Sequence, residues 1–468
     1  MPEFALIFRL RVRKYLRAAV LAAAIASVGM FTADPSAADS KGESKGGPKN
    51  DRATRLLATV PVPNTASNTT NGMYVFDISW VDQASRTYYL ADRSNAVVDI
   101  VDTQTNALLL QLTGGFKGFT GTNGTSGPNG VVTSGHCLFV TDAPSRVVSF
   151  DTSSFTPSFI GAVTTAAGDA NRADELAFDP ADGILFVINN ADDPPFGTLI
   201  TVDQSTCIMT QPTAPAAGVA APDRVIFTDV NGVDAKNGAE QPQWDPDTGK
   251  FYLSIPQIGK NRSAGGVVRI STKGKIEKTF SIMFCQPAGL TKGPNNDFLV
   301  GCNTVFNTQG HPWSATDPLT AAPIQVVLNV HTGDVDQIGG VGVGDEVWYN
   351  KGDNNYYTAS STSPLRPLDI TPAPPIPPLT AQGAAILGVI DAKDKEVLQL
   401  VPTFNVPAVM TGSNQHPAST AHSVAVDSHN NHVFVPLGAN NVYPSCTTGC
   451  IAVYWHGDED KPGEVALP

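Results

Sequence analysis

The chain lacks the short motifs that mark many enzymes. It contains no Gly-x-Ser-x-Gly, His-Glu-x-x-His, Gly-x-x-x-x-Gly-Lys or Cys-x-x-Cys-His. These absences exclude a serine-hydrolase elbow, a zinc-protease helix, a phosphate-binding P-loop and a c-type haem attachment. The glycine-rich stretch 114–127 has no strand-to-helix context of a nucleotide loop, so we interpret it as a connection between strands.

Long hydrophobic runs are also scarce. The one apolar run, 18–31, follows five basic residues and precedes the small-residue site Ser36-Ala37-Ala38. This pattern predicts a signal peptide at 1–38 and a flexible leader at 39–55. No later stretch approaches the roughly 20 apolar residues that a membrane span needs. We therefore expect a secreted or periplasmic protein that is not membrane-bound; an uncleaved N-terminal anchor is the alternative.

Basic residues are fewer than acidic ones, with 30 Lys and Arg against 43 Asp and Glu and a formal net charge of −13. Such a surface repels phosphate backbones, so we expect no nucleic acid or anionic membrane as partner. The simpler interpretation of the negative charge is that it keeps the protein soluble. A small molecule and a monomeric state are expected instead.

All six cysteines follow the predicted signal peptide, and an even number in an exported chain favours disulfides. Cys446 and Cys450 flank a short turn and form the first predicted pair. Cys285 and Cys302 lie on strands predicted to be neighbours, which makes them the second. Elimination leaves Cys137 with Cys207.

Helices have little room, because 42 Gly and 36 Pro are spread along the chain. What recurs is a polar residue, a short strand, an Asp- or Gly-containing turn and a second strand, most clearly in DELAFDPADGILFVIN (174–189) and EQPQWDPDTGKFYLSIP (240–256). In both, Asp179 or Asp245 opens a turn that a glycine closes, so these aspartates are expected to be structural.

Weaker copies of the unit begin at Asp77, Pro128, Gln286, Asp345 and His422, and a third strand follows most copies. Units repeated at this spacing predict an all-β fold, a β-propeller of seven four-stranded blades, with six or eight as alternatives. A β-sandwich array or a β-helix is the structural alternative. We expect one propeller domain over 56–468, with insertions at 303–323 and 361–382. The Pro-rich insertion is expected to cap one mouth of the channel, with a disordered excursion as the alternative.

The first strand of each propeller blade lines the central channel, so the polar residue opening each repeat should point inward. The predicted ring contains Asp77, Asn129, Glu175, Gln241, Gln286, Glu346 and His422, with Asp174, Glu240 and Asp345 as alternates. Converging carboxylates need an offsetting charge. We predict a divalent cation held by Asn129, Glu175, Asp345 and Glu346, either Ca²⁺, Mg²⁺ or Mn²⁺, with Zn²⁺ less favoured. A water-filled channel of hydrogen-bonded carboxylates is the alternative, and Asp77, Gln241 and Gln286 are expected to line the channel.

His422 is the candidate catalytic residue, because it alone brings a group titrating near neutrality to the predicted ring. It could act as a general base on a metal-bound water or a substrate hydroxyl, and Glu346 is the other residue that could move the proton. The simpler interpretation is a hydrogen-bonded wall histidine. His416, His429 and His432 match no zinc-ligand spacing.

The repeats at 174–189, 240–256 and AHSVAVDSHNNHVFVPLG (421–438) resemble the superfamily of NHL, YVTN and SMP-30/gluconolactonase-like propellers. The resemblance to the last group implies a divalent metal on the channel axis that opens lactones, with Glu175, Asn129 and Asp345 or Glu346 as ligands. The expected function is thus a metal-assisted hydrolase or lyase of a small ester, lactone or sugar acid. A non-catalytic propeller that binds a ligand or a protein is the alternative.

Overall fold

The structure is a computed structural model that describes residues 53–314, 320–321, 323–342, 344–363 and 384–456. The predicted signal peptide, nearly all of the leader and most of the 361–382 insertion lie outside the described residues. No α-helix occurs within the described ranges, and the secondary structure consists of strands and three short 3₁₀ turns, η2 (Asn123–Thr125), η3 (Asp229–Asn231) and η5 (Pro444–Cys446). In this part of the chain no helix is long and apolar enough to cross a membrane.

The strands pair mainly as antiparallel groups of four. The first group contains β2 (Phe76–Asp82), β3 (Thr87–Asp92), β4 (Val97–Asp102) and β5 (Ala107–Thr113). The second contains β6 (Val131–Ser134), β7 (Cys137–Asp142), β8 (Arg146–Asp151) and β9 (Ser158–Thr164). The third contains β10 (Leu176–Asp179), β11 (Ile184–Asn189), β12 (Phe196–Asp203) and β13 (Ile208–Met209), with β14 (Arg224–Ile226) also paired to β12.

The next two groups share one sheet through a single parallel bridge between Ala264 and Cys285. They contain β16 (Pro242–Asp245), β17 (Lys250–Ile255), β19 (Ala264–Ile270) and β20 (Ile276–Met283), then β21 (Cys285–Lys292), β22 (Asp297–Val305), β23 (Ile324–Asn329) and β24 (Val335–Gly339). A further group contains β25 (Gly344–Asn350), β26 (Asn355–Ser363), β27 (Ala384–Asp391) and β28 (Glu396–Pro402). The short strands β15 (Ala235–Lys236) and β18 (Gln257–Ile258) pair with each other.

The last group combines both ends of the described chain. It contains β29 (Ala425–Asp427), β30 (His432–Leu437), β31 (Cys450–Trp455) and, beside β31, the first strand β1 (Arg55–Pro61). Antiparallel pairing of β1 with β31 makes the N-terminal strand part of the C-terminal sheet, which ties the two ends of the fold together.

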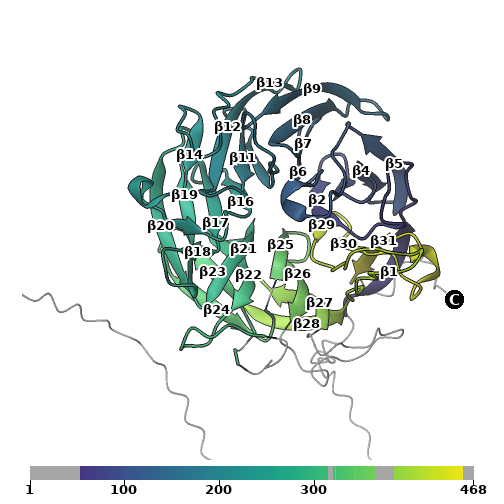
Figure 1. The fold of residues 1–468 in the computed structure, drawn as a ribbon. Helices are drawn as coiled ribbons and strands as arrows, with labels where there is room; N and C mark the ends of the chain where they lie inside the picture. Colours follow the sequence, from purple (N-terminus) through teal and green to yellow (C-terminus); the bar gives the residue numbers. More distant parts are fainter. Residues whose placement is uncertain (1–52, 315–319, 322, 343, 364–383, 457–468) are drawn as a thin grey trace, which may run out of the picture. The chain divides into compact units, whose positions relative to one another are not determined.

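The first strands of successive groups contact one another: β2 contacts β6, β6 contacts β10, and the series continues through β16, β21 and β25 to β29, which contacts β2. In Figure 1, β2, β6, β16, β21, β25 and β29 lie toward the middle, and β5, β9, β20 and β28 lie toward the periphery. An all-β, propeller-like arrangement therefore follows from the pairing and from these contacts.

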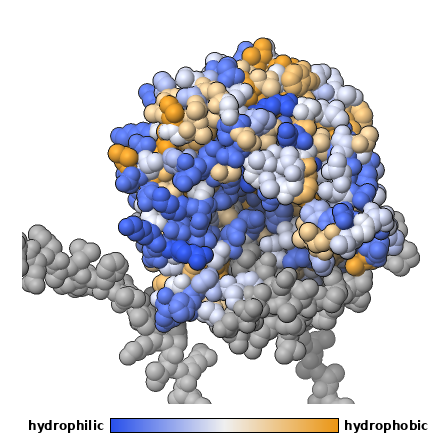
Figure 2. Space-filling model, viewed as in Figure 1, coloured by the Kyte–Doolittle hydropathy of each residue, from blue (hydrophilic) through white to orange (hydrophobic). Residues whose placement is uncertain are grey.

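Burial decreases from the inner strands of a group to its outer strand. Nearly all of β3 is buried, whereas exposed and partly buried residues alternate along the outer strand β5. Inner strands covered on both faces carry near-continuous apolar residues, as Tyr88 to Ala91 do. The core lies between neighbouring groups, where Phe139 of β7 stacks on Phe178 of β10 at 5.4 Å between ring centroids. On the face shown in Figure 2, hydrophilic residues cover much of the middle and hydrophobic residues are scattered.

The turns form as their sequences predict. The Asp179 carboxylate accepts the backbone N–H of Ala181 at 2.8 Å, and Gly183 closes the turn at φ +66°. Asp245 likewise accepts the N–H of Asp247 at 3.1 Å. It also accepts a hydrogen bond from the Lys292 ammonium on β21. Asp245 is thus more than a turn residue, because it links two neighbouring groups of strands.

The three predicted disulfides are confirmed: Cys137–Cys207, Cys285–Cys302 and Cys446–Cys450. Cys285 and Cys302 are on the paired strands β21 and β22, as expected. Cys137–Cys207 joins the second group to the third across a sequence separation of 70. Within the described chain no cysteine is free, which fits an oxidising compartment.

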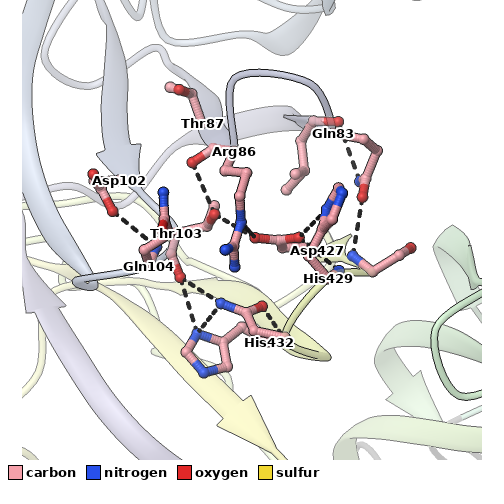
Figure 3. Close-up of polar contacts among 12 residues, drawn as sticks. Gln83, Arg86, Thr87, Asp102, Thr103, Gln104, Asp427, His429 and His432 are labelled. Atoms are coloured by element: carbon pink, nitrogen blue, oxygen red, sulfur yellow. Dashed lines mark hydrogen bonds and ion pairs between the residues drawn. The ribbon is translucent and has the colours of Figure 1, made fainter.

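A polar network joins the first and last groups (Figure 3). The Asp427 carboxylate at the end of β29 accepts Nε–H of Arg86 at 3.0 Å and the hydroxyl of Thr103 at 2.5 Å. Nδ1 of His432 lies 3.0 Å from the Thr103 carbonyl oxygen. These contacts join the turn between β29 and β30 to the β2–β3 and β4–β5 turns of the first group.

Candidate functional site

The predicted ring residues stand at the starts of the inner strands. Asp77 and Gln286 are the second residues of β2 and β21, and Glu346 is the third residue of β25. The other members stand just before their strands: Asn129 before β6, Glu175 before β10, Gln241 before β16 and His422 before β29. Seven inner strands in mutual contact therefore carry these positions at one end.

Six carboxyl groups from these starts interact electrostatically with one another. We call them the acidic cluster; they are Asp77, Asp174, Glu175, Glu240, Asp345 and Glu346. The acidic cluster contains both members of the pairs 174–175 and 345–346. The positions that the sequence gave as alternates therefore lie in the cluster together with the preferred ones. The ring has more acids than its alignment predicted.

Two arginines offset part of this charge. The Arg93 guanidinium, only 1% exposed, donates to Asp77 Oδ2. Arg172 Nη1 lies 3.4 Å from the same oxygen, and Arg172 Nη2 lies 2.6 Å from Asp174 Oδ2. Asn190 extends the network, because its amide donates to Glu240 Oε2 at 3.2 Å. Buried carboxylates paired in this way keep their ionised form at lower cost.

The members of the acidic cluster differ in protonation. Burial opposes ionisation of Asp77, but Arg93, His422 and Arg172 outweigh it and lower its pKa to about 2. Burial together with Asp77 outweighs Arg172 and raises the pKa of Asp174 to about 7. Burial and neighbouring carboxylates raise the pKa of Glu240 to about 8 and hold those of Glu175 and Glu346 well above the usual range. The surroundings of Asp77 therefore favour its ionised form, whereas burial and the neighbouring carboxylates favour the protonated forms of Glu175 and Glu346.

His422 has an acceptor near each ring nitrogen. Nδ1 lies 3.0 Å from the Thr420 carbonyl oxygen, and Nε2 lies 3.7 Å from Asp77 Oδ1. Burial lowers the pKa of His422, but Asp77, Asp345 and the Thr420 carbonyl outweigh burial and raise it above its ordinary value. The imidazole stacks on Phe76 at 5.2 Å between ring centroids. This environment favours the imidazolium form.

The remaining predicted ring residues use their side-chain amides for hydrogen bonds to other parts of the chain. Asn129 Oδ1 accepts from Arg93 Nε at 2.8 Å, and its amide donates to the Ala173 carbonyl at 2.8 Å. Gln241 Oε1 accepts the N–H of Leu290 at 2.5 Å, and Gln286 donates to the Arg262 carbonyl at 3.1 Å. These amides hold neighbouring strands or Arg93 in place.

The divalent cation that the sequence predicts at the acidic cluster stays a prediction. Among the described residues, the one trio of His, Cys, Asp or Glu ligand atoms within 4.8 Å of one another is His136, Cys137 and Cys207. Those cysteines are bonded to each other, so they offer no thiolate. A cation needs several oxygens converging at about 2 to 2.6 Å, whereas here the arginines already pair with Asp77 and Asp174 and the Asn129 oxygen binds Arg93. Two oxygens of the acidic cluster, Asp174 Oδ1 and Glu175 Oε2, are buried without a hydrogen-bond partner in the described structure and could serve as ligands.

A pocket of about 310 Å³ lies beside His422, and we call it the aromatic pocket. Its walls come from three separate segments: Tyr74 and Phe76 at the start of β2, Phe119 and Asn123 from the glycine-rich connection, and Thr420 with His422 before β29. Tyr74 stacks on His416 at 3.8 Å between ring centroids, nearly parallel. The pocket volume suits a ligand of one ring.

Sequence reasoning missed Arg93, Arg172 and the aromatic walls. Arg93 follows β3, which runs antiparallel to β2 and so ends beside the start of β2. Arg172 precedes the ring pair 174–175 by two residues. A basic residue at either position could have predicted a partner for the ring acids. The pocket walls gave none, because they meet only in the folded chain.

No protein-family model matches the chain, and no curated protein matches it. The predicted membership of the NHL, YVTN and SMP-30 superfamily therefore stays a prediction. A solved chain of hydrazine synthase from Kuenenia stuttgartiensis is similar in structure, with a TM-score of 0.55 and 10% identity over 85% of this chain and 99% of that one. At that identity the likeness shows the fold alone.

Proposed function

We propose that the protein is an exported seven-bladed propeller that binds a single-ring small molecule in the aromatic pocket and transfers a proton to it from His422. The observation that carries this proposal is the position of His422, which lines the pocket and also touches Asp77 of the acidic cluster. A titratable group at the boundary between an aromatic pocket and a buried charged network is a candidate for acid–base chemistry.

The seven groups of strands and their cyclic contacts support the blade count, and the pairing of β1 with β31 supports closure of the ring. The disulfides and the basic–apolar–small pattern of residues 1–38 support export. Sequencing the N-terminus of the secreted protein tests export, and a start near Asp39 is expected.

His422 is better suited to give a proton than to take one. With Nδ1 at the Thr420 carbonyl and Nε2 toward Asp77, both ring nitrogens face acceptors. When solvent water attacks the carbonyl carbon of a small ester or lactone, the imidazolium can protonate the leaving oxygen as its bond to that carbon breaks, and the proton lost by the water restores the imidazolium. Asp77 stabilises the charged ring before transfer. The sequence assigned His422 as a base, and the ion pair with Asp77 and the raised pKa of His422 favour the opposite role.

A non-catalytic ligand-binding propeller is the second candidate. One observation favours it: Arg93 and Arg172 already pair with Asp77 and Asp174, so much of the network is satisfied without a reaction. A binding site needs only the aromatic walls and the polar groups of Asn123, Thr420 and His422.

The experiment uses phenyl acetate and small five- and six-membered lactones as probes, with binding followed by calorimetry and turnover by product release. We expect turnover by the wild type to fall as pH rises through the pKa of His422, because the acid form is lost. His422→Gln should keep binding and lose turnover at least about a hundredfold. His331→Gln, at an exposed position, is the matched control.

Binding without turnover would favour the second candidate. Neither binding nor turnover, together with no effect of Tyr74→Ala on any probe, would contradict the pocket itself.

A further inference from the structure

A pair of buried carboxyl groups lies next to the aromatic pocket and outside the acidic cluster. Asp92 ends β3 and Asp99 lies on β4, and both are 0% exposed. Asp99 pairs with Leu90 and Asp92 with Val97, so the two side chains are diagonal neighbours on one face of the sheet. Asp99 Oδ2 has no hydrogen-bond partner in the described structure. Two such carboxyl groups cannot both ionise without strong repulsion.

Asp92 organises the turn between β3 and β4. Its oxygens accept the backbone N–H of Asn95 at 3.0 Å and the Asn95 amide at 2.6 Å. Asn95 Oδ1 in turn accepts the N–H of Thr65 at 2.9 Å and the Asn68 amide at 2.8 Å. The turn thereby fixes the segment 65–68, which leads to the pocket.

The same turn holds the pocket wall directly. Ser94 Oγ accepts the backbone N–H groups of Tyr74 at 3.0 Å and Val75 at 2.9 Å. Ser94 N–H donates to the Val75 carbonyl at 2.9 Å. Both Tyr74 and Val75 line the aromatic pocket. A displacement of residues 92–95 would therefore release the wall that presents the Tyr74 ring.

Asp99 reaches the same segment by a second route. The Gln111 amide of β5 donates to Asp99 Oδ1 at 3.0 Å and to the Pro63 carbonyl at 3.0 Å. Two acidic residues thus fix the segment 63–75 from both sides.

We infer that Asp92 and Asp99 form a proton-dependent latch on the aromatic pocket: the pair holds the Tyr74 wall while one of the two carboxyl groups keeps its proton, and releases the wall when both are ionised. The inference rests on the proposed function only in taking the aromatic pocket as the ligand site. Ligand binding would then be favoured in acidic surroundings.

The groups that face Asp92 and Asp99 support a pocket wall that is held at low pH and released at high pH. Asp92 faces Asn95, Ser94 and Asp99, while Asp99 faces Asp92, Gln111 and the Tyr88 ring. The neighbouring Arg93 directs its guanidinium to Asp77 and Asn129. Burial, partly opposed by Asn95, raises the pKa of Asp92 to about 6, and burial with Asp92 raises that of Asp99 well above its ordinary value. Raised acid pKa values mean that the stabilisation is full below about pH 4 and is lost as pH rises through the folded-state values.

The test is amide hydrogen exchange of the full mature protein from pH 5 to pH 9, corrected for the intrinsic rate. In the wild type, the protection factors of the Tyr74 and Val75 amides should fall at least about tenfold across this range, while amides of β12 stay protected. Asp99→Asn should remove the pH dependence, because a neutral amide keeps the hydrogen bonds without repulsion. Asp102→Asn, a turn residue at the end of β4, is the matched control and should keep it.

Asp92→Asn serves as a second variant if Asp99→Asn fails to fold. Protection at Tyr74 and Val75 that is independent of pH in the wild type, or unchanged pH dependence in both variants, would overturn the latch. A pH-dependent wall in a protein that binds no probe would contradict the proposed function and leave the latch standing.

Discussion

Nε2 of His422 lies 3.7 Å from Oδ1 of Asp77, and the other oxygen of that carboxylate is taken by Arg93 and Arg172. Asp77 therefore stands between the pocket histidine and the buried arginines, and the charge state of His422 depends on it. Asp77 and Arg93 belong to the first group of strands, Arg172 precedes the third and His422 precedes the last strand group, so the contacts between inner strands bring these residues together.

Replacing Asp77 by Asn should lower the pKa of His422, because a buried imidazolium loses its anionic partner. The same change leaves Arg93 without its carboxylate and should reduce the free energy of unfolding by about 3 kcal/mol. NMR titration of the imidazole and urea unfolding measure the two effects. Asp82→Asn, in the following turn, is the control; an unchanged His422 titration in Asp77→Asn would show that the pair does not form.

Removing divalent cations should leave the melting temperature of the purified protein unchanged, because Arg93 and Arg172 already offset charge in the acidic cluster. A ligand bound only to the native state would add RT ln(1 + [L]/Kd) to stability, so its removal would be visible. Differential scanning calorimetry with and without a strong chelator, with elemental analysis, makes the measurement. Stoichiometric metal and a lower melting temperature would support the cation predicted from the sequence.

Glu175→Gln and Glu346→Gln separate the same alternatives by mutation. Burial and neighbouring carboxylates favour the protonated form of both groups, and the Gln amide resembles that neutral form, so each change should leave stability equal or higher. If the two residues shared a metal instead, each change would lower both metal content and stability, and the double change would cost less than the sum.

Asp245→Asn should reduce the free energy of unfolding by about 1 to 3 kcal/mol, because it loses a charged hydrogen bond from Lys292. Asp179→Asn should cost less than about 0.5 kcal/mol, since Asn also accepts the turn N–H groups and the structure shows no cationic partner for Asp179 among the described residues. Urea midpoints compare the two variants. Equal effects would show that the contact between strand groups contributes nothing to stability.

Breaking Cys137–Cys207 with paired serines should cost about 4 kcal/mol, and breaking Cys446–Cys450 about 2 kcal/mol, because the first closes a loop of 70 residues and the second one of 4. Denaturant unfolding of both double variants checks the order. A larger loss from the second pair would mean that local geometry outweighs loop closure.

The repeat of strand, turn and strand was readable from the sequence because its causes are local. Asp179 and Gly183 form their turn from their own backbone preferences, and alternation of apolar residues marks the strands. The position of Glu175, Glu346 and His422 at inner-strand starts followed from that repeat alone. The cysteine pairs followed from neighbouring strands and from elimination.

Only the tertiary structure decided what stands opposite each ring residue. Arg93 and Arg172 lie 79 residues apart in numbering, yet both reach Asp77, and the aromatic pocket joins segments near residues 75, 120 and 420. Such contacts depend on how the ends of the inner strands converge, and no local preference encodes that convergence. The sequence determined where acidic groups would gather. The folded chain determined that two arginines lie against these groups and shift their pKa values.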